Sequence, residues 1–180
     1  GVVSLVFMYR MNERNTAIND DWLPSVVTAE ELDTLTSNFR IREYGHIIAW
    51  EPDIMALREE QMADLLLEID AKFAEYDQLG SSDEEKQMLA SARLAWADYL
   101  QLHNTVVELS RSGEMEQAMV IARADSQKLF DEATEIFEEL VEYSKTNAQT
   151  ASHESTLLYS RAWMLLISII VLLIAAGFLL

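Results

Sequence analysis

The last 19 residues of this chain carry no charged side chain, and this segment limits the fold more than any other. Residues 162–180 read AWMLLISIIVLLIAAGFLL. A helix of this length measures roughly 28 Å, which is enough to cross the hydrocarbon core of a bilayer. Tyr159 and Trp163 suit an interfacial aromatic belt, and Arg161 suits a side chain that reaches for the lipid headgroups. The sequence therefore predicts a transmembrane helix over 162–180.

The start of the chain is also uncharged. Residues 1–9, GVVSLVFMY, are too few to cross a membrane and show no signal-peptide cleavage pattern. We interpret them as the end of a first transmembrane helix, with a frayed apolar helix start as the alternative. Every charged residue lies between Arg10 and Arg161. The sequence therefore predicts one domain outside the membrane over 10–161. The uncharged segments before and after this domain are expected to contact membrane lipid.

The charge of the central region excludes several classes of partner. The chain has 31 acidic and 13 basic residues, which give a net charge of −18. Nucleic acids and anionic lipid surfaces are bound by clusters of Lys and Arg, so we expect no nucleic-acid partner. The chain has no Cys, and it contains no nucleophile elbow, Gly-rich phosphate loop or catalytic-triad pattern. We therefore do not expect an enzyme.

Helix-breaking residues are rare, because the chain holds only two Pro and five Gly. The residues between them are mostly strong helix formers, which predicts four long helices. We expect the first helix to end near residue 50 with a kink at 20–24, the second to cover 52–78, and the third to cover 83–111. Ser82 and Glu85 fit a capping box at the start of the third helix. The fourth is expected to begin near residue 114 and to run unbroken through Arg161 into the membrane.

Apolar residues at steps of three and four predict how these helices pack. The middle two helices would each measure roughly 42 Å, and the outer two would be longer at their membrane ends. The fold class is therefore all-α, an antiparallel up-down-up-down four-helix bundle with helices one and four continuing into transmembrane helices. The predicted buried stripes are Leu32, Leu35 and Phe39; Met55, Met62, Leu65, Ile69 and Tyr76; Leu89, Trp96, Leu100 and Val107; and Met115, Met119, Ala122, Leu129, Ala133, Ile136 and Leu140.

Polar and aromatic residues on or beside these stripes are candidates for a binding site. Arg42 and His103 each lie eight residues before the distal end of their predicted helices, so we expect them at the same depth. Arg, His and Tyr would hydrogen-bond a small carboxylate, and Trp would supply an apolar wall. In the alternative interpretation, Arg42 pairs with an acid such as Glu43 and the histidines are satisfied core residues. The candidates are Arg42, His46, Trp96, Tyr99 and His103.

Metal and haem sites are weaker alternatives. Glu43 and His46 form one Glu-x-x-His element, but a di-iron bundle needs this element on two helices and the chain has no second copy. His46 and His103 are the pair that would ligate haem across the core, although no haem-attachment sequence is present. We therefore expect no cofactor.

Four segments resemble the four-helix-bundle sensor domain of bacterial methyl-accepting chemotaxis proteins. They are NDDWLPSV at 19–26, NFRIREYGH at 38–46, AWADY at 95–99 and GEMEQA at 113–118. The resemblance implies a periplasmic domain anchored in the bacterial inner membrane, a homodimer formed through helix one, and cytoplasmic signalling proteins downstream. It also adds Arg40, because such domains often bind ligand at the subunit boundary with arginines of helix one. Positions 36, 40, 43 and 47 would then face the partner subunit.

The resulting hypothesis is a ligand-sensing domain of a transmembrane chemoreceptor. It would bind a small molecule, such as an organic or amino acid carboxylate, and would signal through helix four to a cytoplasmic chemotaxis output. Two alternatives remain open. One is the extracytoplasmic sensor of a histidine kinase or a diguanylate cyclase, and the other is a haem- or metal-binding membrane bundle.

Overall fold

The computed structural model describes residue 9, residues 22–79 and residues 82–178, with side chains described as far as residue 168. The helices in these ranges are α2 (Leu23–Ile47), α3 (Pro52–Leu79), α4 (Asp83–Arg111), α5 (Met115–Arg123) and α6 (Asp125–Phe178). Ser25–Tyr143 form one compact unit, and the described part of Ser144–Leu180 belongs to a second. The bundle is the first of these units.

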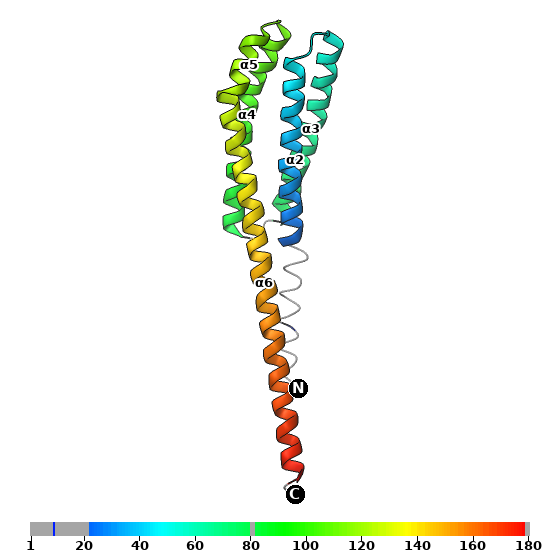
Figure 1. Cartoon of the computed structure of the whole chain (residues 1–180), viewed down its shortest axis with the longest axis vertical. Coiled ribbons are helices and arrows are strands. Elements are labelled where there is room, and N and C mark those ends of the chain that lie inside the picture. Colours follow the sequence, from blue (N-terminus) through cyan, green and yellow to red (C-terminus); the bar gives the residue numbers. More distant parts are fainter. Residues whose placement is uncertain (1–8, 10–21, 80–81, 179–180) are drawn as a thin grey trace. The chain divides into compact units, whose positions relative to one another are not determined.

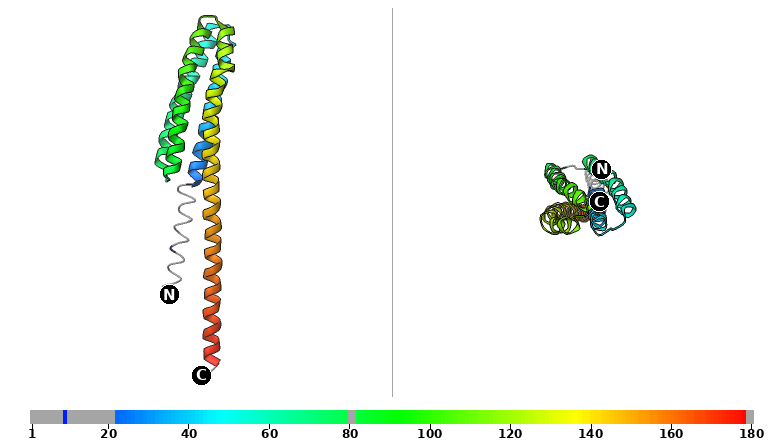
Figure 2. Two further views of the ribbon diagram at one scale, coloured as in Figure 1. Left: turned by 90° about the vertical axis from the view of Figure 1, so that its left-hand side faces the viewer. Right: turned by 90° about the horizontal axis from the view of Figure 1, so that it is seen from above.

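Within Ser25–Tyr143 the helices lie side by side and alternate in direction. Figures 1 and 2 show α2, α3 and α4 packed with α5 and the first part of α6. The connection from α2 to α3 and the turn from α4 to α5 lie at the same end of the bundle (Figure 1). This end is called the distal end below. The prediction of an all-α four-helix bundle is confirmed.

The larger of two apolar core clusters joins α2, α3, α4 and α6, and a smaller one joins α2, α4 and α5. Each predicted stripe supplies several buried side chains of the larger cluster, so the heptad pattern identified the inward faces correctly. Phe39 of α2 lies at its centre, with its ring edge against Trp96 at 5.4 Å and Tyr99 at 6.1 Å between centroids. The buried members are Ala29, Leu32, Phe39, Met62, Ile69, Phe73, Tyr76, Leu89, Ala92, Ala95, Trp96, Tyr99, Val107, Ala133, Phe137 and Leu140.

The ends of α4 follow the local sequence signals. At its start, the backbone N–H of Glu85 donates to the hydroxyl oxygen of Ser82 at 3.0 Å, and this hydroxyl donates to the Glu85 carboxylate at 3.3 Å. At its end, Gly113 has a φ of +80°, a left-handed conformation that Gly adopts without strain. The Glu114 N–H then donates to the Leu109 carbonyl oxygen at 2.9 Å, which closes the helix. The predicted cap and stop are both confirmed.

The end of α2 was predicted too late. The helix ends at Ile47 and not near residue 50. Pro52 opens α3, and the Glu51 carbonyl oxygen already accepts from the N–H groups of Ile54 and Met55 at 3.0 and 3.1 Å. The chain must therefore reverse direction over residues 48–51, which leaves no room for another turn of α2.

The prediction of an unbroken fourth helix is also wrong at its distal end. The chain breaks at Ala124, which has φ −111° and ψ −96°, and this residue separates α5 from α6. No Gly or Pro stands there, so the sequence carries none of the usual signals for a break. From Asp125 onward, α6 runs without interruption to Phe178. The cause of the break is a contact from α2, described below.

The predictions about the membrane segments mostly concern parts of the chain that the structure does not describe. Residues 1–8, residues 20 and 21 of the predicted kink at 20–24, and the side chains of 169–180 lie outside the described residues. Over its described residues, none of the helices is long and apolar enough to cross a membrane. The two predicted membrane segments therefore stay predictions.

Candidate functional site

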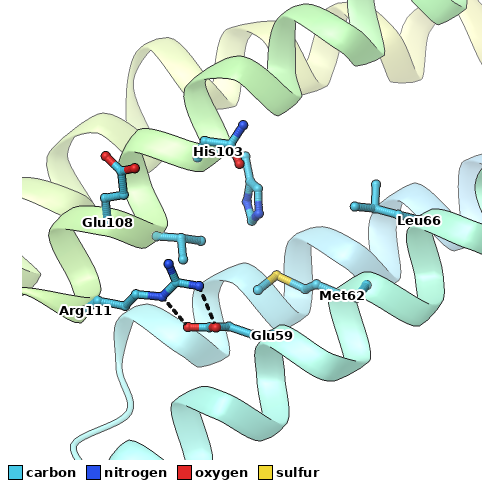
Figure 3. Close-up of a pocket in the computed structure, with 9 residues that line it drawn as sticks. Glu59, Met62, Leu66, His103, Glu108 and Arg111 are labelled. Carbon is cyan, nitrogen blue, oxygen red and sulfur yellow. Dashed lines mark hydrogen bonds and ion pairs between the residues drawn. The ribbon is translucent and has the colours of Figure 1, made fainter.

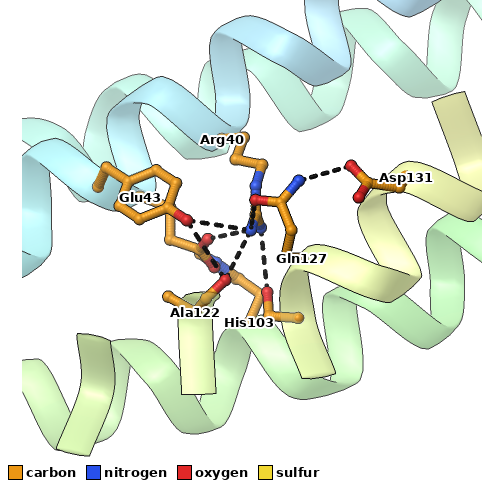
Figure 4. Close-up of polar contacts among 8 residues, drawn as sticks. Arg40, Glu43, His103, Ala122, Gln127 and Asp131 are labelled. Carbon is orange, nitrogen blue, oxygen red and sulfur yellow. Dashed lines mark hydrogen bonds and ion pairs between the residues drawn. The ribbon is translucent and has the colours of Figure 1, made fainter. Parts of the chain in front are cut away.

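A buried arginine connects α2 with the point where α5 gives way to α6. Arg40 is only 5% exposed. Its Nη2 donates to the carbonyl oxygen of Ala122 at 2.7 Å, and its Nη1 donates to the hydroxyl of Ser126 at 3.1 Å. Nη2 also donates to Gln127 Oε1 at 3.0 Å (Figure 4). These contacts hold the segment 122–127, which we call the α5–α6 junction.

The Arg40 contact explains the helix break. In an uninterrupted helix the Ala122 carbonyl would accept from the N–H four residues later, at Ser126. Here it accepts from Arg40 at 2.7 Å and from the hydroxyl of Tyr44 at 3.3 Å. A charged donor forms a stronger hydrogen bond than an amide, which offsets the loss of one helical bond. No local sequence pattern predicts that Arg40 replaces a helical donor at the Ala122 carbonyl, because the two residues are 82 positions apart.

Aromatic rings enclose the Arg40 guanidinium. Its central carbon lies 4.9 Å from the ring centroid of Phe130, 5.1 Å from that of Tyr44 and 5.5 Å from that of Tyr99. Ring faces attract a cation and exclude water, so the charge is stabilised without solvent. The guanidinium is thus held by the protein itself.

Glu43 links Arg40 to α4. It is fully buried, and its Oε2 lies 3.3 Å from Arg40 Nη1. Its Oε1 lies 2.7 Å from Nδ1 of His103, which is 8% exposed. An ionised carboxylate only accepts hydrogen bonds, so the ring hydrogen of His103 sits on Nδ1. The result is a continuous path from His103 through Glu43 and Arg40 to the α5–α6 junction (Figure 4).

His46 belongs to a second network nearer the distal end. Its Nδ1 lies 2.9 Å from the Ser110 hydroxyl, and its Nε2 lies 2.9 Å from Glu59 Oε1. Arg111 holds the same carboxylate with two hydrogen bonds of 2.6 Å. The Arg111 hydrogen bonds, aided by His46, lower the pKa of Glu59 to about 2. Both ring nitrogens of His46 are thus bonded within the protein, which leaves neither free to ligate iron.

A pocket between α3 and α4 lies next to these networks. Its volume is about 390 Å³, and it is lined by Met62, Leu66 and Val107 on the apolar side. His103 projects from α4 toward Met62, and the paired side chains of Glu59 and Arg111 close one end (Figure 3). The pocket therefore touches both networks.

The structure brings together some of the predicted site residues and separates others. Arg40 and His103 share Glu43, with Tyr99 packed against the Arg40 guanidinium. Trp96 stacks on Tyr99 at 4.9 Å. His46 lies in the second network. Arg42 is half-buried and has no hydrogen bond or ion pair with any described residue.

The expected orientation of Arg40 is corrected by the structure. Positions 36, 40, 43 and 47 were predicted to face a partner subunit, but all four are buried inside the bundle. The stripe is inward because its polar groups find partners there: the Thr36 hydroxyl donates to the Leu32 carbonyl oxygen at 2.9 Å, and Arg40 reaches the α5–α6 junction. Glu43 pairs with Arg40 and His103 and not with Arg42, which also corrects the alternative interpretation of Arg42.

Sequence reasoning missed several members of the site. Glu43 was considered as part of a metal motif, as a partner of Arg42 and as a position facing a partner subunit, but not as a partner of Arg40. Its position three residues after Arg40 is a signal for a pair on one helix face. Ser126 and Gln127 had no signal, because they become ligands of Arg40 only through the break at Ala124. Arg111 was treated as a helix end and not as a pocket residue.

Two aromatic polar groups in the core are unsatisfied. The Tyr99 hydroxyl and the Trp96 Nε1 are buried without a hydrogen-bond partner among the described residues. Burial, followed by the nearby charge of Glu43, raises the pKa of Tyr99. Such groups cost free energy and are rare in folded proteins. The Tyr99 ring packs against the Arg40 guanidinium, and Trp96 stacks on Tyr99.

Comparisons with known proteins agree with this architecture. A family described as "Four helix bundle sensory module for signal transduction" matches residues 1–159. The chain is also similar to the "Putative sensory transducer protein YvaQ" of Bacillus subtilis strain 168, with 19% identity over 161 residues. This match covers 89% of the chain but only 28% of the relative, so the chain spans less than a third of that protein.

Proposed function

Since the chain belongs to the family of four-helix-bundle sensory modules for signal transduction, we propose that it is the extracytoplasmic sensor of a transmembrane chemotaxis transducer. In this proposal the bundle binds a small molecule in the periplasm of a bacterium. Binding alters the start of α6, and the change passes along this helix to a cytoplasmic chemotaxis output.

The Arg40 contact is the observation that carries the proposal. The α5–α6 junction is held by Arg40 from α2, so a small movement of α2 or α4 changes the contacts at the start of α6. The same helix supplies residues to the bundle and, from Ser144 onward, to the second unit. Packed interfaces convert small shifts into discrete rearrangements, which is how such a movement becomes a signal.

The occupied guanidinium changes the proposed ligand chemistry. The carboxylate hypothesis relied on an arginine with free donors on helix one. Arg40 already has acceptors at both terminal nitrogens, including Glu43 and Ala122. A carboxylate bound through helix one would have to use Arg42, which has no protein partner among the described residues. We therefore still propose a small molecule as the ligand. Its chemical class is not inferred from Arg40, because that side chain is already bound by the protein.

A homodimer through α2 is part of the same proposal. Three positions of this helix and one directly after its end are spaced seven residues apart, are solvent-exposed and are apolar or uncharged. They are Val27, Thr34, Ile41 and Ile48, of which Ile41 and Ile48 are each 58% exposed. A heptad stripe of this kind is the surface that a second helix covers in a coiled coil. It supports a symmetric α2–α2 contact between two copies of the chain.

Insertion into a membrane is proposed for the end of α6. The large apolar side chains from Trp163 to Ile167 are all exposed by 46% or more. Consecutive exposed apolar residues on every side of a helix suit contact with lipid and not with water. Tyr159 and Trp163, with ring centroids 6.5 Å apart, suit the interface between the two.

The test is a fusion of this chain to the cytoplasmic part of a well-studied transducer. Screening small molecules should identify at least one compound that both raises the Tm of the purified chain and changes the activity of the chemotaxis kinase. A fusion that inserts, dimerises and activates the kinase but responds to no compound that binds the bundle would contradict the proposal.

A further inference from the structure

The pocket between α3 and α4 contains polar groups that the protein leaves unused. Nδ1 of His103 is bound by Glu43 at 2.7 Å, whereas its Nε2 has no partner among the described residues. With the ring hydrogen on Nδ1, Nε2 of a neutral imidazole is a hydrogen-bond acceptor. The ring points from α4 toward Met62 on α3 (Figure 3). His103, which is 8% exposed, lines the pocket and brings this acceptor to it.

Arg111 contributes an unused donor to the same pocket. Its Nε and Nη2 both bind the Glu59 carboxylate at 2.6 Å, which leaves Nη1 without a partner among the described residues. Figure 3 shows this third nitrogen turned away from Glu59. The amide of Asn104, which also lines the pocket, offers one more donor and one more acceptor.

The charges around the pocket favour an uncharged ligand. The Arg111 cation is neutralised by its two hydrogen bonds to Glu59. Glu108 adds a second carboxylate to the lining, and the whole chain carries a charge of −18. No excess positive charge remains to hold an anion, and a cation would find a donor at Arg111. A neutral molecule with both hydrogen-bond donors and acceptors matches the unused groups without a charge conflict.

The lining also includes apolar side chains. Met62 and Leu66 of α3 and Val107 of α4 line the same pocket as the polar groups. Methionine packs well against aromatic rings. A planar ring between these side chains would direct the atoms of its rim toward His103 and Arg111.

We propose that this pocket binds an uncharged planar heterocycle whose rim carries N–H and C=O groups, the chemistry of a nucleobase. An N–H of the ligand donates to His103 Nε2, and a carbonyl oxygen accepts from Arg111 Nη1. The proposal rests on the proposed sensory function and names its ligand class. It places the ligand inside one subunit, between α3 and α4.

Binding at this place has a direct route to the α5–α6 junction. The ligand would contact His103, whose Nδ1 is bound to Glu43 at 2.7 Å, and Glu43 is bound to Arg40 at 3.3 Å. A donor at Nε2 polarises the ring and strengthens the bond at Nδ1, since linked hydrogen bonds reinforce one another. The ligand therefore acts on the same contacts that hold the start of α6.

Binding is tested by calorimetry on the purified chain with matched probes. Uracil and hypoxanthine carry both kinds of group, 1,3-dimethyluracil has the same carbonyls but no N–H, and benzoate carries a charge. We expect uracil and hypoxanthine to bind at least about tenfold more tightly than 1,3-dimethyluracil, the effect of one buried hydrogen bond, and benzoate not to bind. Equal affinities for uracil and its dimethyl form, tighter binding of benzoate, or no binding of any heterocycle would overturn the proposal.

Two variants locate the contacts. His103→Asn keeps a donor near Glu43 but removes Nε2, so it should weaken uracil binding about tenfold and leave 1,3-dimethyluracil unchanged. Arg111→Gln should weaken both. Arg93→Gln is the matched control, because Arg93 lies on the same helix and pairs with Asp77 of α3 at 2.6 Å outside the pocket. Circular dichroism confirms the fold of each. An equal effect of His103→Asn on both probes, or an effect of Arg93→Gln, contradicts the assignment.

The fusion protein separates this proposal from the sensory function. If another compound drives the kinase and its affinity is unchanged by His103→Asn, the pocket assignment fails while the sensory function stands. If no compound that binds the bundle changes kinase activity, the sensory function itself fails.

Discussion

The Arg40 guanidinium donates to the backbone carbonyl oxygen of Ala122 at 2.7 Å, across 82 residues of sequence. This single contact joins α2 to the end of α5. It accompanies the one interruption of the fourth predicted helix among the described residues. A buried cation has thus replaced a helical hydrogen bond. The arrangement makes the start of α6 depend on a side chain of another helix.

Removal of the Arg40 charge should destabilise the bundle strongly. Arg40→Met leaves the fully buried Glu43 without its cation, and breaking a buried pair in this way costs about 3–5 kcal/mol. Chemical denaturation followed by circular dichroism measures the loss. Arg93→Met breaks a half-exposed pair with Asp77 and should cost about 1 kcal/mol or less. In the double variant Arg40→Met, Glu43→Gln, no charge remains buried, so part of the stability should return. Additive losses would show that the two side chains do not act as a pair.

The pair of Glu59 and Arg111 predicts a specific dependence of stability on pH. The Arg111 hydrogen bonds lower the pKa of Glu59 to about 2 from an ordinary value near 4.5. A lowered pKa contributes stability above the unfolded value, and this contribution is lost as the pH falls from about 4.5 toward 2. Glu59→Gln should therefore lower the Tm by about 2–4 °C at pH 7. The difference from the parent chain should shrink steadily below pH 4.5. A difference that is the same at pH 7 and pH 3 would contradict this account.

Two tyrosines should respond in opposite ways to the loss of a hydroxyl. The Tyr99 hydroxyl is buried with no described partner, so Tyr99→Phe should leave the free energy of unfolding unchanged or raise it by about 1 kcal/mol. The Tyr76 hydroxyl donates to the buried Glu85 carboxylate at 3.2 Å, so Tyr76→Phe should lower the free energy of unfolding by about 1–3 kcal/mol. Urea titrations of both variants give the comparison. A larger loss for Tyr99→Phe than for Tyr76→Phe would show that Tyr99 has a partner.

The proposed dimer can be tested by disulfide trapping, because the chain has no Cys of its own. Ile41→Cys places one thiol on the exposed stripe of α2, and mild oxidation should convert most of the protein to a covalent dimer. Leu94→Cys on α4 is the control, since Leu94 is similarly exposed at 65% but lies on another helix. Equal cross-linking of both variants would rule out α2 as the dimer surface.

The sequence was sufficient for the bundle because its information is periodic and local. The steps of three and four placed Phe39, Trp96 and Leu140 in the core, and the capping pattern at Ser82 fixed the start of α4. A helical hydrogen bond that is replaced by a bond from a distant side chain leaves no periodic or local pattern in the sequence. The break at Ala124 depends on Arg40, a residue that periodicity alone could assign either to the core or to a subunit boundary.

The candidate binding site stays a prediction, although two of its members are neighbours. Tyr99 and His103 both follow the inward face of α4, and their ring centroids lie 6.3 Å apart. Depth counting favoured Arg42 over Arg40, but rotation about the helix axis decides which of two neighbouring arginines is buried. That rotation is set by the partners at the α5–α6 junction, which the sequence did not reveal.

Kinase activity of the fused transducer with Arg40→Lys tests the central claim most directly. Lysine keeps the charge but loses the planar fork whose two terminal nitrogens bind Ala122 and Ser126 together. If the α5–α6 junction controls the output, Arg40→Lys should shift the basal kinase activity several-fold while circular dichroism shows an intact bundle, and Arg93→Lys should not. A folded Arg40→Lys fusion whose basal activity and ligand response equal those of the parent would contradict the account.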